Sequence, residues 1–461
     1  MADILIEHGT IITMNKNREI IEDGAVAIQA RRIAAVGKTD AIRRQYSFES
    51  RIDAKGNPVL PGLVNTHTHF FQTLYKSLSD DLALVEWLPN IYKLSVNIHP
   101  DDCYYAALIG CIELIRTGCT CVLDENYPYA GKTSESVLKA FDKIGIRGIV
   151  ARGLFDRDLW NLGTPFLEDT DKQVNDTVAL IEKWRRSDRV RVWFSPNWAS
   201  YCSDELVAKA SEAAEQQRVG VSMHLHEAEE EVQRWKKLTG YSPIQYYHSK
   251  GVKLLNPNLI AVHCVWLDDV DIRILKETGA NVSHNPVSNM YLASGISPIP
   301  KMLKAGIPIG LGTDGAASNN CQDMIEVMKM TALLHKVATL DPLSIGAEKV
   351  LEMATIDGAK TMGLEKEIGS IEPGKRADLV VFDLKHPNTT PINRPHSQIV
   401  YCSKSHNVDT VIIDGKIVMK KGRITTLDEA KTVKKTQEVA DDLIERSDAK
   451  RFRRGWSKQE K

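Results

Sequence analysis

The stretch 63-LVNTHTHF-70 ends an apolar run with two histidines that are one residue apart. Alternate residues of a strand point to the same side, so His67 and His69 would present two imidazoles together. That geometry suits a divalent metal ion, although two ligands do not complete a site. The rest of the chain must then supply further ligands and a fold that gathers them.

Seven more apolar segments of strand length follow, most of them separated by segments with helical signals. The segment after the first strand, for example, has Asp101 and Asp102 near its start and Gly118 at its end, which favour a helix start and stop. Strand–helix alternation repeated eight times predicts an α/β fold, a (β/α)8 TIM barrel. The predicted strands cover residues 58–67, 118–126, 147–155, 190–198, 220–227, 259–266, 280–287 and 307–315.

The two ends of the chain differ from its middle. Short alternating strands with turn signals occur in 3-DILIEHGTIITM-14 and 24-GAVAIQARRIAAVG-37, and again in 369-GSIEPGKRADLVVFDL-384. We expect both ends to join as one small β-sandwich domain. The predicted organisation is residues 1–57 and 366–426 in the sandwich, 58–365 in a catalytic barrel, and 427–461 in a charged helix that is either solvated or an oligomer contact.

The composition excludes several kinds of partner. The chain has 461 residues and a formal net charge of −1, so neither nucleic acid nor an anionic membrane is expected to bind it. No apolar run approaches the length of a membrane span, and the N-terminus does not resemble a signal peptide. The eight cysteines are scattered, and Cys119-Thr-Cys121 reads more simply as buried thiols than as metal ligands. We expect a soluble protein of the cytoplasm.

Charged or imidazole side chains stand at the carboxyl ends of six of the eight predicted strands, where barrel enzymes carry their catalytic groups. A core strand would end in apolar residues, since burying an unpaired polar group costs about 2–7 kcal/mol. His67 and His69, one histidine of strand five and Asp314 together make three imidazoles and one carboxylate. That set suits Zn²⁺, with Fe²⁺, Co²⁺ or Mn²⁺ as alternatives.

Strand five offers two histidines, in 223-MHLHEAE-229. His224 and His226 would share a face, and a strand end can bend, so parity does not choose between them. We favour His224, which lies three residues before Glu227, and expect His226 either to support a ligand or to be structural. A metal ion can lower the pKa of a bound water to about 7, and the reaction also needs a proton carrier, for which Glu227 is best placed.

Five motifs, NTHTH, HLHE, AVHC, SHNP and GLGTDGAASNN, resemble in this order the amidohydrolase superfamily. The resemblance covers nearly the whole chain and is closer to one branch, which holds S-adenosylhomocysteine/methylthioadenosine deaminases and s-triazine hydrolases such as atrazine chlorohydrolase and melamine deaminase. It implies a metal-dependent hydrolase of a carbon–nitrogen bond other than a peptide bond. The expected reaction is deamination of a small planar N-heterocycle, triazine-, purine- or pterin-like, by hydroxide generated at the metal.

The resemblance also implies residue roles. The metal ligands would be His67, His69, His224 and Asp314. Glu227 would protonate a ring nitrogen, and His263 and Asp314 would act beside the water and the leaving group. Strand four ends in FSPNW, without the lysine or glutamate of binuclear relatives, which implies one metal ion. Relatives of this kind are homo-oligomers, so we expect at least a dimer that acts on a small molecule.

Departures from both subgroups leave the substrate open. Where the nucleoside deaminases carry P-H-S-P after strand four, this chain has Asn197 in place of the histidine, which disfavours a nucleoside. Gly315 replaces an asparagine of the triazine chlorohydrolase type, and His284 is kept where that enzyme lacks it. An acyclic urea, carbamate or thiocarbamate substrate, or ring dechlorination, is the alternative. A non-catalytic protein on the same fold is disfavoured, because every expected ligand is present.

Six side chains are predicted to contact the substrate. Aromatic side chains near the strand ends could stack on a flat ring, although those in the loop after strand one could equally pack that loop. The predicted contacts are Gln72, Trp87, Glu125, Asn126, Trp198 and His284.

Overall fold

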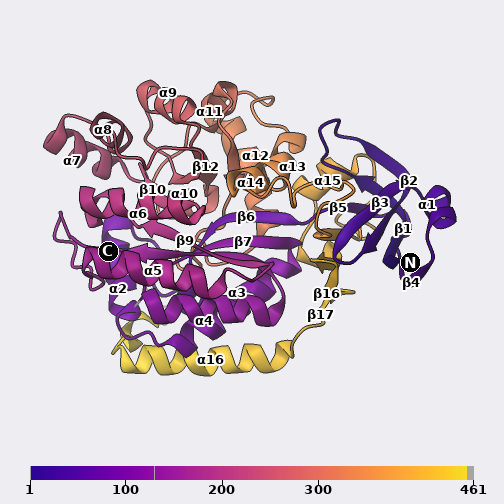
Figure 1. Ribbon diagram of the computed structural model, residues 1–461, viewed down its shortest axis with the longest axis horizontal. Coiled ribbons are helices and arrows are strands. Elements are labelled where there is room, and N and C mark those ends of the chain that lie inside the picture. The colour runs from indigo at the N-terminus through magenta and orange to yellow at the C-terminus, as the bar shows by residue number, and fades with distance from the viewer. Residues whose placement is uncertain (1, 129, 454–461) are drawn as a thin grey trace.

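The computed structural model describes residues 2–128 and 130–453 and shows a closed barrel beside a mixed sheet (Figure 1). The barrel has eight strands in the order β10-β11-β12-β13-β6-β7-β8-β9, and neighbouring strands pair in parallel. The predicted (β/α)8 barrel is therefore confirmed. Its strands are β6 (Leu63–Thr68), β7 (Cys119–Asn126), β8 (Arg147–Leu154), β9 (Val190–Pro196), β10 (Val221–Leu225), β11 (Leu259–His263), β12 (Asn281–His284) and β13 (Ile309–Leu311).

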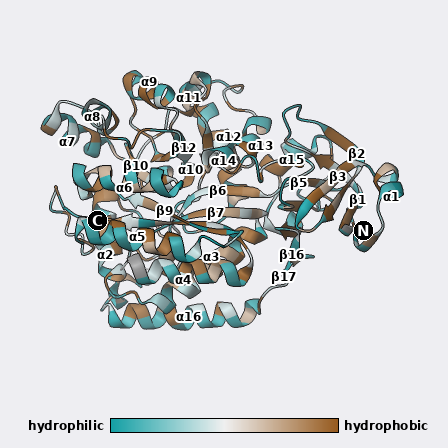
Figure 2. Ribbon diagram, in the orientation of Figure 1, coloured by the Kyte–Doolittle hydropathy of each residue, from teal (hydrophilic) through white to brown (hydrophobic). Residues whose placement is uncertain are grey.

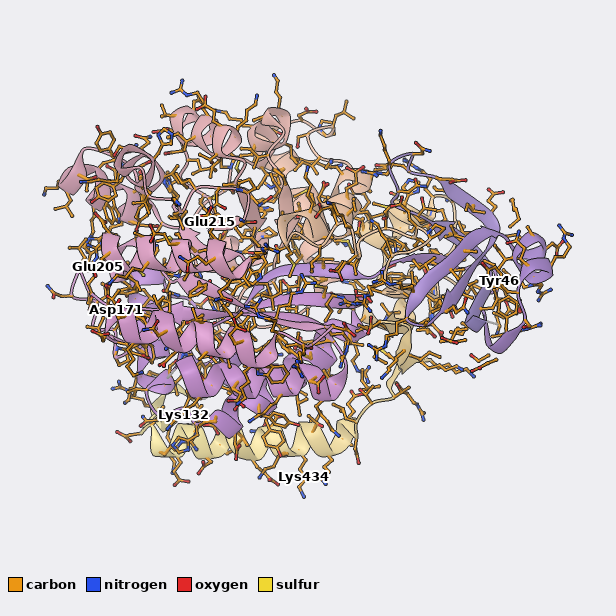
Figure 3. The ribbon with its side chains drawn as sticks, viewed as in Figure 1. Tyr46, Lys132, Asp171, Glu205, Glu215 and Lys434 are labelled. Atoms are coloured by element: carbon orange, nitrogen blue, oxygen red, sulfur yellow. The ribbon has the colours of Figure 1, made fainter. Side chains whose placement is uncertain are left out.

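Helices surround the barrel, with their hydrophilic faces outward (Figure 2). Asp171, Glu205 and Glu215, which are labelled in Figure 3, lie on helices outside the barrel, and all three are exposed. The helices are α2 (Leu84–Ser95), α3 (Pro100–Arg116), α4 (Ala130–Ile144), α5 (Thr170–Trp184), α6 (Asp204–Gln217), α7 (Glu229–Thr239), α8 (Pro243–Lys250), α9 (Asp269–Thr278), α10 (Pro286–Tyr291), α11 (Ile299–Ala305), α12 (Met324–Thr339), α13 (Ala347–Met353), α14 (Ile356–Thr361) and α15 (Pro395–Tyr401).

Local sequence explains where the barrel helices begin. Helix α3 starts with Pro100 in its first turn, and His99 and Asp102 form a reciprocal capping box before it. Helix α6 is capped by Ser203, whose side chain accepts a hydrogen bond from the backbone N–H of Leu206. Such caps fix the helix starts that follow the barrel strands.

Both chain ends build the mixed sheet, as predicted for the small β domain. Its order is β17-β16-β15-β14-β5-β1-β2-β3, and β4 pairs with β1. The strands are β1 (Ala2–Ile12), β2 (Ile20–Gln29), β3 (Arg32–Lys38), β4 (Phe48–Asp53), β5 (Pro58–Pro61), β14 (Leu379–Phe382), β15 (Val408–Ile413), β16 (Lys416–Lys420) and β17 (Arg423–Ile424), and α1 (Thr39–Gln45) follows β3.

The strand predicted over residues 58–67 is divided in two. Its first part, β5, pairs with β1 and β14 of the mixed sheet, and its second part, β6, belongs to the barrel. Gly62 separates them, and a Cβ at that position would lie only 2.0 Å from Oγ1 of Thr120. The backbone at Gly62 approaches Thr120 of β7 so closely that only glycine fits. The chain passes from the mixed sheet to the barrel at this residue.

Alternation along the strands separates two layers of side chains in the barrel. One layer fills the barrel interior and includes Cys121, Leu123, Ile149 and Val262. All eight cysteines are free thiols, and Cys119 and Cys121 belong to no cluster of potential metal ligands among the described residues. The interpretation of this pair as buried thiols therefore holds.

Helix α16 (Glu429–Arg446) lies along the outside of α3, at the bottom of Figure 1. It buries Leu443 and Ile444, and Arg116 binds both carboxylate oxygens of Glu429. One face of this helix is thus packed against the barrel and is not solvated. Residues 454–461 of the predicted terminal segment lie outside the described residues. Within the described chain, no helix has the length and apolar character needed to span a membrane.

Candidate active site

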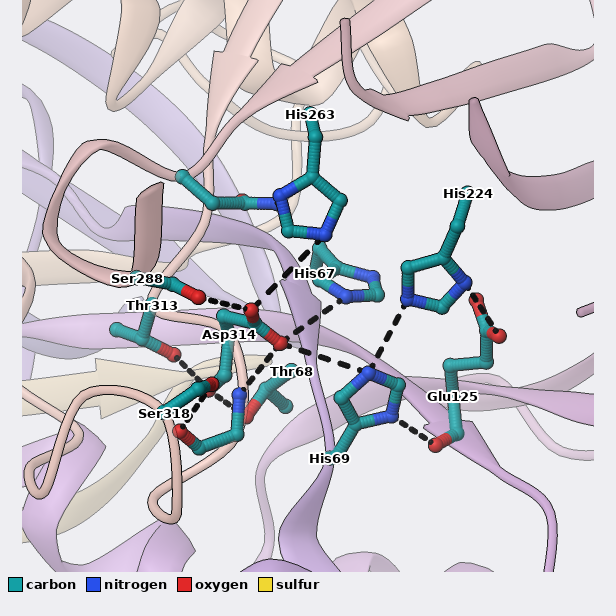
Figure 4. A network of polar contacts seen from close by, with 12 residues as sticks. His67, Thr68, His69, Glu125, His224, His263, Ser288, Thr313, Asp314 and Ser318 are labelled. Carbon is teal, nitrogen blue, oxygen red and sulfur yellow. Dashed lines mark hydrogen bonds and ion pairs between the residues drawn. The ribbon is translucent and has the colours of Figure 1, made fainter. Parts of the chain in front are cut away.

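Four predicted ligands gather at the carboxyl end of the barrel (Figure 4). His67 lies near the end of β6 and His69 directly follows that strand, His224 lies on β10, and Asp314 follows β13. Oδ1 of Asp314 is 3.4 Å from Nε2 of His67 and 3.5 Å from Nε2 of His69, and the Nε2 atoms of His69 and His224 are 3.3 Å apart. All four side chains are buried.

The backbone at the strand ends adopts conformations that few side chains favour. His226, His263, Cys264 and Asp314 all have positive φ, between 51° and 72°. Left-handed backbone at non-glycine residues costs about 1–3 kcal/mol each and is common at functional sites. Two of these residues, His263 and Asp314, have side chains that line the pocket at the mouth of the barrel.

Hydrogen bonds outside the cluster orient two of the imidazoles. The Nδ1 atom of His69 lies 2.7 Å from the backbone carbonyl oxygen of Glu125, and Nδ1 of His224 lies 2.9 Å from that of Asn197. A carbonyl oxygen only accepts, so both Nδ1 atoms carry hydrogen. The Nε2 atoms of both rings therefore face the centre of the cluster, the arrangement of metal-binding histidines.

His67 provides a test of whether the cluster fits a metal ion. Its side chain is fully buried, yet neither ring nitrogen has a hydrogen-bond partner among the described residues. Such a group is costly unless a ligand completes it. Burial lowers the pKa of His67, and it lowers the pKa of His69 to about 3, so both imidazoles are neutral and able to donate to a cation. Three imidazoles and a carboxylate at these distances fit a divalent metal.

Asp314 is fixed by two further donors. Ser288 Oγ donates to Oδ2 at 2.5 Å, and the backbone N–H of Gly315 donates to Oδ1 at 2.7 Å. These bonds leave Oδ1 facing His67 and His69, while Oδ2 lies 3.9 Å from Nε2 of His263. One carboxylate thus joins the ligand cluster to His263.

Glu227 and His263 stand on the pocket side of this cluster. Burial raises the pKa of Glu227 to about 8, which keeps a proton on the carboxyl group at neutral pH. Burial lowers the pKa of His263 to about 4, so its imidazole stays neutral. His263 Nδ1 lies 2.9 Å from Oδ1 of Asn289, which accepts its hydrogen and leaves Nε2 free as a base.

His226 points away from the cluster. Its Nδ1 atom lies 3.0 Å from the backbone carbonyl oxygen of Trp266, and its Nε2 atom accepts from the backbone N–H of Ile244 at 3.3 Å. Both ring nitrogens are thus used to connect loops. This geometry favours His224 over His226 as the strand-five ligand.

Three of the six predicted substrate contacts line the pocket above the cluster: Gln72, Trp87 and Trp198. Trp87 lies on α2 with three other lining residues, Leu84, Leu88 and Tyr92, at helical spacing. Its Nε1 atom donates to the backbone carbonyl oxygen of Ala317 at 3.0 Å, so the indole is held in place. The α2 wall gives the pocket an apolar, aromatic side.

The other three predicted contacts are not among the pocket-lining residues, and each has at least one polar atom in contact with a protein partner. The carboxylate of Glu125 accepts from Asn197 Nδ2 at 2.8 Å and from Ser222 Oγ at 3.2 Å. Oδ1 of Asn126 accepts from Thr133 Oγ1 at 2.8 Å. Nε2 of His284 lies 3.0 Å from Nε2 of His335. All three predicted contacts are completely buried.

Sequence reasoning missed several residues of the site. Asn289, which orients His263, lies five residues after His284, and an asparagine in 285-NPVSN-289 is a signal that could have been weighed. The apolar spacing of Leu84, Leu88 and Tyr92 was visible too, but such a stripe is more often core than pocket wall. Four further lining residues had no distinctive signal: Tyr127, Tyr201, Leu292 and Ser318.

Two protein-family models match parts of this chain. Residues 59–418 match the model described as "Amidohydrolase family", and residues 24–46 match a model described as the imidazolonepropionase-like composite domain of bacteria. The first match includes all the barrel strands and most of the C-terminal part of the mixed sheet.

Among the proteins similar to this chain are two deaminases and one solved structure. The "5'-deoxyadenosine deaminase" of Methanosarcina mazei is 38% identical over 449 residues, which cover 97% of this chain and 99% of the relative. The "5-methylthioadenosine/S-adenosylhomocysteine deaminase" of Syntrophobacter fumaroxidans is 37% identical over 95% of this chain and 98% of its own. A crystal structure of an adenosine deaminase from Xanthomonas campestris with bound zinc matches with a TM-score of 0.90 and 30% identity, over 96% and 98% of the two chains.

Proposed function

The chain belongs to the amidohydrolase family, and from that premise we propose that it deaminates a planar N-heterocycle, replacing a ring amino group with hydroxyl and releasing ammonia. The first candidate substrate is the adenine ring of a 5'-modified adenosine, since two relatives at 37–38% identity are named deaminases of such compounds. The observation that carries the proposal is the buried carboxyl group of Glu227, which lines the pocket beside a cluster of three imidazoles and a carboxylate.

Asn197 had disfavoured a nucleoside on sequence grounds. Its side chain donates to Glu125, and its carbonyl oxygen accepts from His224, so its polar atoms serve the metal cluster. Asn197 thus supports the ligand cluster, and it also lines the pocket, so its presence does not argue against a nucleoside substrate. The names of the relatives favour the adenine ring over a triazine or an acyclic urea.

The chemistry divides between a metal and this chain's side chains. A divalent metal held by His67, His69, His224 and Asp314 would act as a Lewis acid and lower the pKa of a water molecule to about 7. Zinc is the proposed ion, because the ligand set suits it and a similar solved structure contains it.

The acid–base steps fall to Glu227 and its neighbours. Glu227 donates its proton to the ring nitrogen next to the amino-bearing carbon and takes up a proton from the attacking water. The neutral His263 and Asp314 hold that water, and His263 passes the second proton to the departing amine. The carbon–nitrogen bond breaks, one water is consumed and one ammonia is released. The flat ring lies between the pocket-lining side chains of α2 and Trp198, whose indole stacks on it, and Gln72 also contacts the ring.

An oligomer of this chain in the cytoplasm completes the proposal. Large apolar side chains stand in solvent along α12 and the turn after it, where Val337, Leu340 and Leu343 are 74%, 90% and 85% exposed. Leu340 also has a positive φ, unusual for a side chain of its kind. Leu333 and Val337 lie one turn apart on α12 and Leu340 caps its end, and a two-fold axis would place these side chains against those of a second copy. Light scattering of wild type and Leu340→Glu tests this, with a dimer expected to become a monomer.

Ammonia release by zinc-loaded protein tests the proposed reaction. The panel holds 5'-deoxyadenosine, 5'-methylthioadenosine, adenosine, guanine, an aminopterin-type base, an amino-s-triazine and an aryl urea. Ammonia from the adenine compounds is expected. Amine release from the urea, with no ammonia from any ring, would overturn the proposed substrate class while leaving the metal site intact.

A further inference from the structure

Residue 125 contacts two of the four ligands through different parts of its structure. Its backbone carbonyl oxygen accepts from Nδ1 of His69 at 2.7 Å. Its carboxylate oxygen Oε1 lies 3.2 Å from Nδ1 of His224 (Figure 4). The end of β7 therefore holds one ligand from the neighbouring strand β6 and another from across the barrel, on β10.

The carboxylate of Glu125 is enclosed by protein donors. Oε1 accepts from Asn197 Nδ2 at 2.8 Å and Oε2 accepts from Ser222 Oγ at 3.2 Å, while the side chain has no exposed surface. A buried carboxylate is tolerated only when it is paired and hydrogen-bonded, and these partners meet that need. Glu125 is also not among the residues that line the pocket, so its carboxylate faces the ligands and not the substrate.

We propose that Glu125 is a positioning residue for the metal ligand His224, and that Asn197 holds Glu125 in place. His224 has one N–H at Nδ1, which lies between Oε1 of Glu125 and the carbonyl oxygen of Asn197. This contact fixes the tautomer and the ring plane, and a negative carboxylate makes the opposite Nε2 a better donor to a cation. The inference rests on the proposed function only for its catalytic readout.

Asn197 contributes to this arrangement twice. Its carbonyl oxygen accepts from His224 and its side-chain amide donates to Glu125, so residues 125, 197 and 224 form one closed set of contacts. Removal of the amide would leave Oε1 of Glu125 with one donor fewer inside a buried site. We therefore expect the effects of changing Glu125 and Asn197 to be coupled and not additive.

Zinc affinity of the metal-free protein, measured by competition with a chromophoric chelator, tests the inference. Glu125→Gln keeps the size of the side chain but removes its charge, and we expect it to bind zinc about 10–100-fold more weakly. Asn197→Ala should weaken binding less, and the double variant should be no weaker than Glu125→Gln alone. Glu215→Gln, on the exposed face of α6, is the matched control and should equal wild type.

A zinc affinity for Glu125→Gln within twofold of wild type would overturn the inference. A raised KM with unchanged zinc affinity would instead make Glu125 a substrate contact. Circular dichroism of each variant checks the fold, and Asn197→Ala still tests the idea if Glu125→Gln does not fold, since unchanged zinc affinity in that variant counts against it. Zinc binding needs no substrate, so a failure of the proposed deamination would show separately, as wild-type protein that binds zinc and releases no ammonia.

Discussion

The Nε2 atom of His263 lies 3.7 Å from Oε2 of Glu227, across the pocket side of the ligand cluster. Burial moves the two pKa values in opposite directions, to about 4 for His263 and about 8 for Glu227. At neutral pH the carboxyl group therefore carries a proton and the imidazole does not. Both groups are therefore neutral, one as an acid and the other as a base. Such a pair suits a reaction in which a ring nitrogen is protonated and water gives up a proton.

Glu227→Gln should bind zinc with unchanged affinity and lose activity. The amide keeps the shape of the side chain but cannot transfer a proton, and general acid–base catalysis contributes about 10²–10⁴-fold. Steady-state ammonia release measures the loss, with Glu229→Gln, an exposed neighbour on α7, as the control. A Glu227→Gln enzyme within tenfold of wild type would rule out the proposed role.

Zinc should stabilise the fold through His67. Neither nitrogen of the buried imidazole has a hydrogen-bond partner among the described residues, so a bound ion supplies the missing interaction. Zinc at 100 times its dissociation constant should add about 2.7 kcal/mol to the free energy of unfolding. Urea denaturation of metal-free wild type with and without zinc measures this gain. His67→Ala should show little of it, and an equal gain in that variant would place the ion elsewhere.

Asp124 should make a contribution to the free energy of unfolding of the metal-free protein that decreases as pH rises from about 4 to 8. Burial raises the pKa of its carboxyl group to about 8, and Oδ2 has no partner among the described residues. In the unfolded chain this group loses its proton near pH 3.9. Between these values the folded state binds more protons than the unfolded state, so the free energy of unfolding decreases with pH.

Asp124→Asn should remove this part of the pH dependence. Its Oδ1 can still accept from the backbone N–H of Phe70, which lies 2.7 Å from Oδ1 of Asp124, and the amide stays neutral at every pH. Relative to wild type, the variant should gain stability between pH 5 and pH 8 on the order of a few kcal/mol, since one pKa unit corresponds to about 1.4 kcal/mol. Urea midpoints at pH 5, 6.5 and 8 give the comparison. Parallel curves for the two proteins would contradict the assignment.

The barrel and the ligand cluster could be predicted from sequence because both follow local rules. Alternation along a strand fixes which side chains point into the barrel, and those at its carboxyl end that point inward reach the barrel mouth. His67, His69 and Asp314 stand at such ends, and the closed barrel then brings together residues about 250 positions apart.

The side-chain partners of Glu125, Asn126 and His284 could not be predicted in the same way. Each stands at or near a strand end, yet each binds a partner such as Asn197, Thr133 or His335 that follows from neither period nor motif. The sequence also could not predict that one face of α2 lines the pocket, because an apolar stripe that faces a pocket has the same spacing as one that faces the core.

The barrel and the mixed sheet are joined by a buried ion pair that should dominate the stability of their contact. Arg147 on β8 donates from Nε to Oδ2 of Asp378 at 2.7 Å and from Nη2 to Oδ1 at 3.1 Å, and both side chains are at most 3% exposed. Removing one partner leaves an unpaired buried charge, so Arg147→Met should cost about 3–5 kcal/mol of unfolding free energy. The exposed pair of Arg185 and Glu182 is the control, and Arg185→Met should cost much less than Arg147→Met.

The double variant Arg147→Met/Asp378→Asn separates the pair from its surroundings. Replacement of both charges by neutral groups of similar size is often close to neutral, because the desolvation of each ion is no longer incurred. The introduced amide would keep an oxygen for the backbone N–H of Asp414, which donates to Asp378 at 2.8 Å in the wild-type protein. We therefore expect the double variant to recover most of the stability that Arg147→Met loses, as measured by urea denaturation. Additive losses would mean that Arg147 stabilises the contact through Asp414 and Asp188 as much as through Asp378.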